Sequence, residues 1–440
     1  MNPSVSPPPP KPPRAPPAAR GVLPSARAVP ADGWPLIAAR MLTNFSSGFL
    51  TVMLTIYLVI AGMSPLTIGF VVSTQGLVGG LLSIPIAMLA DNFGRKRFIV
   101  LGLLMSGLAG LVFLLTLDPV LVFAGAAMMG LSTANANAPF VAMLTGQTTS
   151  EDNRNQTFAM LSFLAGIAYA SGSLAAAAPT AVFAPYFGLG AVDSFRPLFA
   201  VQFFLGLAAA LLVHLRVRDV RGPRPAGRRS WRSLVKVPRK SMPVIVRLSI
   251  LGLIGLGAGV ILPLFSLWFY LRFHLDVAVI APYFSAMSFL TAFASLLSPR
   301  LARQHGSVVA IVGTQISSVA LLVSIPFMPT YVLAGLLMIA RNVMMNMAGP
   351  IQTSFTMGLV APDERATASS IINTFDAVPR AFGPSMGGYF FTLGLLSLPF
   401  FVTGVMYASS IASFYFLFRN LRPPAADPPE APSKRLDGGR

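Results

Sequence analysis

Long apolar stretches alternate along the chain with short polar or charged segments. A hydrocarbon core about 30 Å thick is crossed by a helix of roughly 20 apolar residues, so each of these stretches is long enough to span a membrane. The pattern predicts twelve spans, with ends placed to within about 2 to 4 residues. They are 35–60, 65–90, 97–116, 120–147, 156–178, 194–215, 244–271, 277–299, 306–326, 330–359, 366–394 and 397–418.

The apolar stretches predict helices throughout. A transmembrane barrel would show alternating segments of about 10 residues, and the sequence has none of that kind. Composition agrees with a polytopic membrane protein, because 54% of the 440 residues are hydrophobic and 10% are charged, with a mean hydropathy of +0.70. A soluble domain carries about 25% charged residues. We therefore expect an all-α integral membrane protein.

The net charge of +18 is concentrated on one side of the predicted topology. Ten Lys and Arg lie between Arg216 and Lys240, and other basic residues occupy loops of the same parity, whereas the opposite loops carry few. The positive-inside rule then predicts a protein of the cell membrane with both termini and the middle loop in the cytoplasm. Lipid headgroups, not nucleic acid, are the expected partner of this basic surface.

The two ends of the chain are rich in proline and lack the apolar core of a signal peptide, so we predict disordered cytoplasmic tails. Cysteine is absent and the three histidines fall near span ends, so we expect neither a metal site nor a cofactor. The predicted organisation is a tail (1–34), a six-helix bundle (35–215), a basic linker (216–243), a second six-helix bundle (244–418) and a tail (419–440).

The two predicted bundles are related in sequence. An offset of 211 residues pairs Pro139 with Pro350, Asp152 with Asp363, Arg154 with Arg365, Gly172 with Gly383, Gly48 with Gly259 and Asn135 with Asn346. Six spans followed by six related spans predict two pseudo-symmetric bundles with a solute site between them.

The loop after the second span reads AMLADNFGRKRF and resembles the loop signature of the major facilitator superfamily. Asp91, Gly94, Arg95, Lys96 and Arg97 match that signature. Ala87 and Asn92 depart from it, and a degenerate copy, RLARQHG, follows the eighth span. The resemblance covers about 35–418 and implies a twelve-helix transporter of drug-efflux type that works by alternating access.

This resemblance implies a gate at Asp91, whose carboxylate would hold the cytoplasmic side closed against the positive N-terminus of the eleventh span. Gly94, Arg95, Lys96 and Arg97 belong to the same gating loop. The alternative is that the basic residues only anchor the loop to lipid phosphates.

Charged residues also occur inside predicted spans. Asp376 lies eleven residues beyond Arg365, hence roughly 16 Å along the helix and near mid-membrane, and Arg341 is expected at a similar depth. Arg380 follows Asp376 by four residues and shares its helix face. A lone charge there costs roughly 2.5 to 3.5 kcal/mol, so Asp376 is expected to pair with Arg341 or Arg380.

Asn342, Asn346 and Asn373 are expected to complete the hydrogen bonds of this network. Two interpretations are open. Either the ion pair locks the tenth and eleventh spans together, or protonation of Asp376, or capture of a substrate charge, breaks the pair and biases which side opens.

In the family that the chain resembles, spans 1, 4, 7 and 10 line the central cavity. The methionines, aromatic residues and few amides of these spans predict a mostly apolar cavity with scattered amides, which suits lipophilic molecules. The substrate candidates are Arg40, Asn44, Asn135, Asn137, Trp268, Asn342, Asn346 and Asn373.

The sequence therefore predicts secondary active transport of a small molecule, with proton-coupled efflux of lipophilic compounds by a monomer as the preferred function. The G-P-x-x-G-G pattern of antiporters is missing from the fifth span and occurs in the eleventh as GPSMGG, so symport or uniport stays open. An excess of Arg in the cavity would favour an organic anion instead. A membrane sensor or scaffold is a further alternative, and an enzyme is not expected because no catalytic constellation is present.

Overall fold

A computed structural model describes residues 29–148, 150–218, 240–361 and 364–419. The predicted tails up to residue 28 and from residue 420, and linker residues 219–239, lie outside the described residues. Every regular element in the described part of the chain is helical.

The first half forms six long helices, which begin where the sequence places N-caps and early prolines. Ser64, Asp118 and Ser150 accept backbone N–H bonds at the starts of α2, α4 and α5. The helices are α1 (Trp34–Ile60), α2 (Pro65–Phe93), α3 (Arg95–Leu115), α4 (Pro119–Gly146), α5 (Glu151–Ala175) and α7 (Arg196–Arg216), with the short η3 (Pro179–Phe183), α6 (Ala184–Phe187) and η4 (Asp193–Phe195) between the last two.

The second half repeats this plan with one change. The predicted continuous span 244–271 is broken into α9 (Met242–Leu248), η5 (Ser249–Leu251), α10 (Gly252–Ile261), η6 (Leu262–Leu264) and α11 (Phe265–Phe273). Pro263 has no N–H to donate within a helix, which accounts for the break at η6. The remaining elements are α12 (Val277–His305), α13 (Ser307–Ser324), η7 (Ile325–Phe327), α14 (Tyr331–Leu359), α15 (Arg365–Thr392) and α16 (Leu398–Phe418).

Each predicted span thus corresponds to a helix or to a run of helices. Within the described residues, ten segments are long and apolar enough to cross a membrane. The other two predicted spans are α12, of which Val277–Thr291 counts as a shorter apolar helix, and α15, which carries the intramembrane charges. Their crossing of the bilayer stays a prediction.

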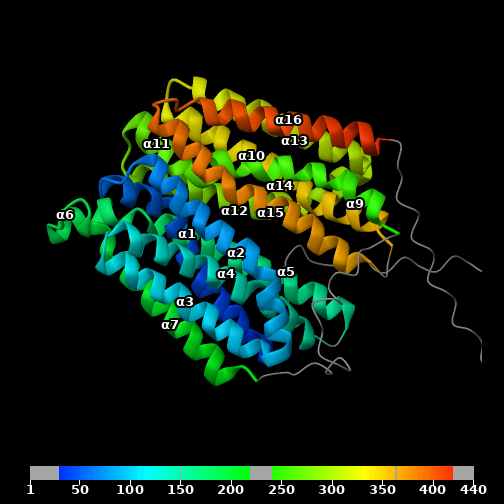
Figure 1. Ribbon diagram of the computed structural model, residues 1–440, viewed down its shortest axis with the longest axis horizontal. Helices are drawn as coiled ribbons and strands as arrows, with labels where there is room; N and C mark the ends of the chain where they lie inside the picture. Colours follow the sequence, from blue (N-terminus) through cyan, green and yellow to red (C-terminus); the bar gives the residue numbers. More distant parts are fainter. Residues whose placement is uncertain (1–28, 149, 219–239, 362–363, 420–440) are drawn as a thin grey trace, which may run out of the picture.

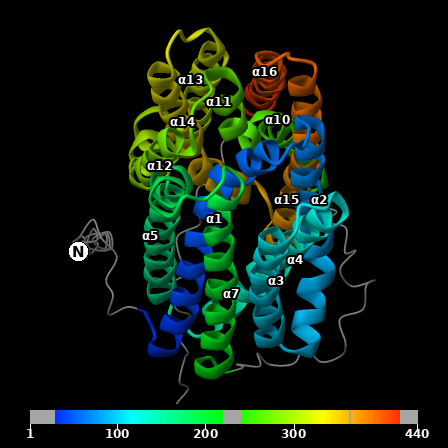
Figure 2. The ribbon, with the colours of Figure 1, turned by 90° about the vertical axis from the view of Figure 1, so that its left-hand side faces the viewer.

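Helices of the same half pack together. In the first half α1 packs on α5 and α7, and α4 packs on α2 and α3; in the second half α10 packs on α15 and α16, and α14 packs on α12 and α13. Figure 1 shows α1 to α7 in the lower part of the molecule and α10 to α16 in the upper part, and Figure 2 shows the same separation end-on. The halves are joined mainly by α2 with α15 and by α5 with α12, and α1 also contacts α11 and α12.

The two ends of the molecule differ in how the halves meet. We name them after glycines with positive φ: Gly62 and Gly394 lie in turns at the Gly62 end, and Gly94 and Gly306 lie in turns at the Gly94 end. The largest apolar cluster, toward the Gly62 end, contains residues of both halves, such as Phe49 and Trp268. The smaller clusters of the described residues each belong to one half. The halves therefore share an apolar core toward the Gly62 end only.

Candidate functional site

A central cavity of about 560 Å³ lies between the halves, next to the shared apolar core. Side chains of α1, α2, α4 and α15 form its wall, together with Pro263 of η6. The polar residues of the wall are Ser47, Thr51, Thr55, Gln75, Ser83, Thr133, Asn137 and Arg380. Its other members are aliphatic residues, prolines, glycines and Met129.

One face of α2 lines this cavity. Gln75, Gly76, Gly79, Gly80 and Ser83 recur three or four residues apart, as one face of a helix requires. Gly79 packs against Thr133 of α4, and Gly76 packs against Ala381 of α15, where a larger residue would collide. Small residues thus bring α2 close to both neighbours and leave space beside them.

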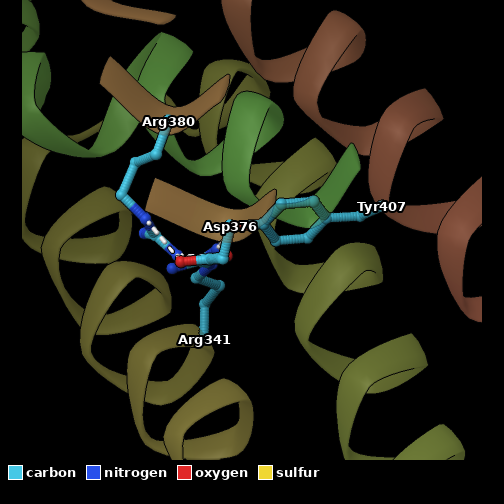
Figure 3. Close-up of polar contacts among 4 residues, drawn as sticks. All are labelled: Arg341, Asp376, Arg380 and Tyr407. Carbon is cyan, nitrogen blue, oxygen red and sulfur yellow. Dashed lines mark hydrogen bonds and ion pairs between the residues drawn. The ribbon is translucent and has the colours of Figure 1, made fainter. Parts of the chain in front are cut away.

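Asp376 and Arg380 form an ion pair on α15 (Figure 3), and Arg380 lines the central cavity. Arg380 Nη2 donates to both carboxylate oxygens, at 2.9 and 2.8 Å, and its Nε donates to Oδ2 at 3.2 Å. The Arg380 side chain is 44% exposed and the Asp376 side chain is 37% exposed. The two charges therefore satisfy each other while facing open space rather than a dry helix seam.

Close backbone packing fixes the position of this pair. Cβ atoms added at Gly252, Gly255 and Gly259 of α10 would collide with the backbone carbonyls of Phe375, Asp376 and Arg380. The absence of side chains at these glycines lets α10 contact the main chain of α15. The seventh span, through α10, thus fixes the position of the ion pair by packing on the backbone of α15, the helix that carries both residues.

A side pocket of about 300 Å³ lies within the second half. Asp376 and Arg380 line it together with Arg341, Asn342, Asn346 and Tyr407, and Arg380 also lines the central cavity. Arg341 is 1% exposed and donates to the Tyr407 hydroxyl at 3.0 Å, with its guanidinium carbon 5.5 Å from the ring centroid. Arg380 therefore stands between two cavities.

The structure distinguishes the two predicted partners of Asp376. Arg380 binds it, whereas Arg341 binds Tyr407. The expected amide contacts go elsewhere: Asn342 donates to Thr291 at 2.9 Å, and Asn346 donates to the backbone oxygen of Asn342 at 2.8 Å. The Asn342 amide thus joins α14 to α12, and the Asn346 amide bonds within α14.

Among the predicted substrate residues, Asn137 lines the central cavity, and Asn342 and Asn346 line the side pocket. The other five lie elsewhere. Trp268 is buried in the shared core, Asn135 is buried with its amide bonded to the Leu131 carbonyl, and Asn44 donates to the Arg40 carbonyl. Arg40 stacks over Phe140, and Asn373 is exposed on α15 outside both cavities.

The seventh and tenth spans, which were expected to line the central cavity, contribute little to its wall in the described state. Only Pro263 comes from the seventh span, and α2 and α15 take the place of the tenth. The missed polar residues include Gln75 and Ser83. Their recurrence with three glycines on one face of an apolar helix was the signal in the sequence that could have identified α2.

The predicted gating loop joins α2 to α3 at the Gly94 end. Gly94 has φ 106°, which side chains rarely adopt, and Gly306 in the degenerate copy has φ 82°. Arg95 Nε donates to Asp91 at 2.9 Å and Nη1 donates to the Ala142 carbonyl at 3.3 Å. Lys96 and Arg97 begin α3, with Arg97 exposed. The signature thus builds a tight turn whose acid binds a base of its own loop.

Residues 36–384 match the family model of the Major Facilitator Superfamily. Multidrug resistance protein 1 of Bacillus subtilis (strain 168) is 24% identical over 381 residues, which cover 84% of this chain and 94% of that protein.

Two solved structures show the same fold. A mutant form of the nucleoside transporter NupG has a TM-score of 0.72 at 12% identity, over 88% of this chain and all of that one. A bacterial homologue of the human lysosomal transporter Spinster, inward-facing and unoccupied, has a TM-score of 0.69 at 15% identity, over 90% of this chain and 98% of that one.

The match extends over most of the helical region and agrees with the helical plan, the loop signature and the cavity between two halves. The chain belongs to the Major Facilitator Superfamily and is a multi-pass membrane transporter of small molecules, not an enzyme.

Proposed function

We propose that this transporter is a proton-coupled exporter of lipophilic compounds, and that it works as a monomer in the cell membrane. The observation that carries the proposal is the position of Arg380, which lines the central cavity while it binds Asp376. A solute in the cavity and a proton on Asp376 would act on the same ion pair. That shared element is what coupling requires.

Sidedness follows from charge. The Gly94 end carries Arg95, Lys96 and Arg97, and the basic linker lies between spans that end on the same side. By the positive-inside rule, this end and both termini face the cytoplasm. Because the halves share their apolar core toward the other end, the described state corresponds to a cavity that admits solutes from the cytoplasm.

The wall of the central cavity favours a lipophilic solute. Leu50, Leu54, Val72 and Met129 supply apolar surface, and the polar groups beside them are mostly hydroxyls and single amides. Such walls bind apolar molecules by burial, with few directional bonds. The similarity to a multidrug resistance protein supports the same class.

Coupling would proceed through the ion pair. With Asp376 ionised, Arg380 is held on the carboxylate and the cavity admits a solute from the cytoplasm. After the halves rock, a proton from outside would neutralise Asp376 and release Arg380, which changes the charge of the wall and favours solute release. Return to the described state would deliver the proton to the cytoplasm.

An organic anion is the alternative substrate, carried by symport or uniport. Arg380 is the only charged residue among the described residues that line the central cavity, and it would attract an anion when Asp376 is neutral. Proton movement triggered by lipophilic neutral or cationic dyes would therefore support the exporter, and movement triggered by organic anions would support the alternative.

The test uses purified protein in liposomes with an imposed pH gradient and a pH-sensitive dye inside. Lipophilic dyes are expected to trigger proton movement with the native protein, and Asp376→Asn should reduce it to the level of empty liposomes while solute binding persists. Folding should survive because Arg380 lines the central cavity, where water can hydrate its guanidinium once the carboxylate is removed.

Asp193→Asn provides a matched control, since it removes an exposed ion pair with Arg196 outside both cavities. It should leave proton movement unchanged. Native coupling in the Asp376→Asn variant would refute the role of this carboxyl group, and proton movement with organic anions alone would favour the alternative.

A further inference from the structure

The side pocket of the second half holds a charge excess that the proposed transport cycle does not use. Among the described residues, it shares Arg380 alone with the central cavity. Its described charged residues are Arg341, Arg380 and Asp376, so two guanidinium groups face one carboxylate. Because Arg380 and Asp376 neutralise each other, the positive charge of Arg341 has no counter-ion in the pocket.

Arg341 is held in an arrangement that leaves part of its guanidinium free. The side chain is 1% exposed, its Nη2 donates to Tyr407, and its buried Nε has no hydrogen-bond partner. A buried guanidinium with an unused donor is unfavourable, since burial removes water without supplying a replacement acceptor. The uncompensated charge favours a ligand with negative charge.

The pocket can admit such a ligand. Its volume of about 300 Å³ exceeds that of one water molecule several-fold. Asn346 and Gly349 line it and are exposed, so the pocket can be reached from solvent on their side. Gln352 accepts a bond from Gln315 at 3.2 Å, which leaves its amide N–H groups as further donors.

We infer that the side pocket binds a small monovalent anion, either chloride or a short carboxylate, close to the guanidinium of Arg341. The anion neutralises the excess charge. Binding at this place needs neither a proton on Asp376 nor a solute in the central cavity, so it is independent of the proposed function.

The test is equilibrium binding of radioactive chloride to the purified protein in detergent, without a pH gradient or a transported solute. Saturable binding to one site is expected. Arg341→Gln should weaken it at least tenfold, whereas Arg196→Gln, which alters a half-buried arginine outside the pocket that is paired with Asp193, should bind as the native protein does.

A second variant covers the case in which Arg341→Gln fails to fold. Asn346→Asp adds a negative charge at the exposed rim of the pocket and should also weaken chloride binding. Displacement of chloride by acetate would extend the site to carboxylates, and binding without displacement would restrict it to the inorganic anion; both support the site.

The inference is overturned if the native protein shows no saturable binding, or if folded variants at Arg341 and Asn346 bind as tightly as it does. Because no transport is measured, either result is readable even if Asp376 proves to have no role in coupling.

Discussion

Asp376 and Arg380 show how a charge pair can be accommodated on a predicted membrane span. Their four-residue spacing brings the side chains together on one helix face, and both face a cavity instead of lipid. The spacing made this pair predictable from the sequence. The partner of Arg341 was not predictable, because Tyr407 lies 66 residues away and approaches it only through the packing of the second half.

Asp91 offers a test of the gate at the residue level. We expect Asp91→Asn to favour the state open at the Gly94 end, because a neutral amide interacts more weakly with the N-terminus of α15 in the closed state. The pair with Arg95 is partly exposed, so thermal stability should change by less than about 1 kcal/mol. The measurement is the alkylation rate of a cysteine introduced by Asn137→Cys, which should rise.

Asp193→Asn is the control for this experiment, since it removes an exposed carboxylate outside the gating loop and outside both cavities. The native sequence contains no cysteine, so the introduced thiol is the only one that reacts. If the thiol reacts equally fast in the proteins with Asp and with Asn at position 91, the Asp91 carboxylate does not act as a gate.

At the scale of elements, the internal repeat corresponds to two equivalent helix contacts. Gly48 of α1 packs on the backbone of α5, and Gly172 of α5 packs on the backbone of α1. The residues 211 positions later, Gly259 of α10 and Gly383 of α15, form the corresponding contact in the second half. The sequence comparison identified these pairs, but not their contact, because a repeat shows equivalence and not proximity.

Gly259→Ala should destabilise the protein strongly. The added methyl group would collide with the Arg380 carbonyl and with Gly383, both parts of a backbone that cannot rotate away. Overpacking of this kind costs about 1 to 3 kcal/mol or more. The loss is measured as a fall in the temperature at which the detergent-solubilised protein stops eluting as a single species.

Gly313→Ala is the matched control, because no atom lies within 4 Å of the added methyl group and alanine favours the helix. It should leave the transition temperature unchanged or raise it. If both variants unfolded at the native temperature, close approach at Gly259 would not be required for stability.

At the scale of the molecule, the sequence predicted two related halves but could not predict which end is closed. A transporter of this kind uses the same residues in both states, and the states differ in which contacts form between the halves. The structure shows those contacts at the Gly62 end: Thr55 bonds to Ser266 at 3.0 Å, Ser385 donates to Ser73 at 3.0 Å, and Leu66 donates to Thr392 at 2.9 Å.

The Thr55–Ser266 bond joins two buried positions that are themselves 211 residues apart, so it lies where equivalent helices of the two halves meet. It must break when the Gly62 end opens. Thr55→Val keeps the shape of the side chain and removes the hydroxyl, which should cost the described state about 1 kcal/mol. The ratio of the two states should then shift about fivefold toward opening at the Gly62 end.

Spin labels introduced by Val120→Cys and Phe327→Cys, exposed positions near this end in opposite halves, would report the shift as a larger population of long distances. Ser266→Ala should produce at least the same shift, because it also removes a bond to the Thr51 carbonyl, and adding Thr55→Val to it should change little since both delete the Thr55–Ser266 bond. Thr74, whose hydroxyl bonds to the Phe70 carbonyl of its own helix, gives the control Thr74→Val. If Thr55→Val leaves the distances of the native protein unchanged, this bond does not hold the Gly62 end closed.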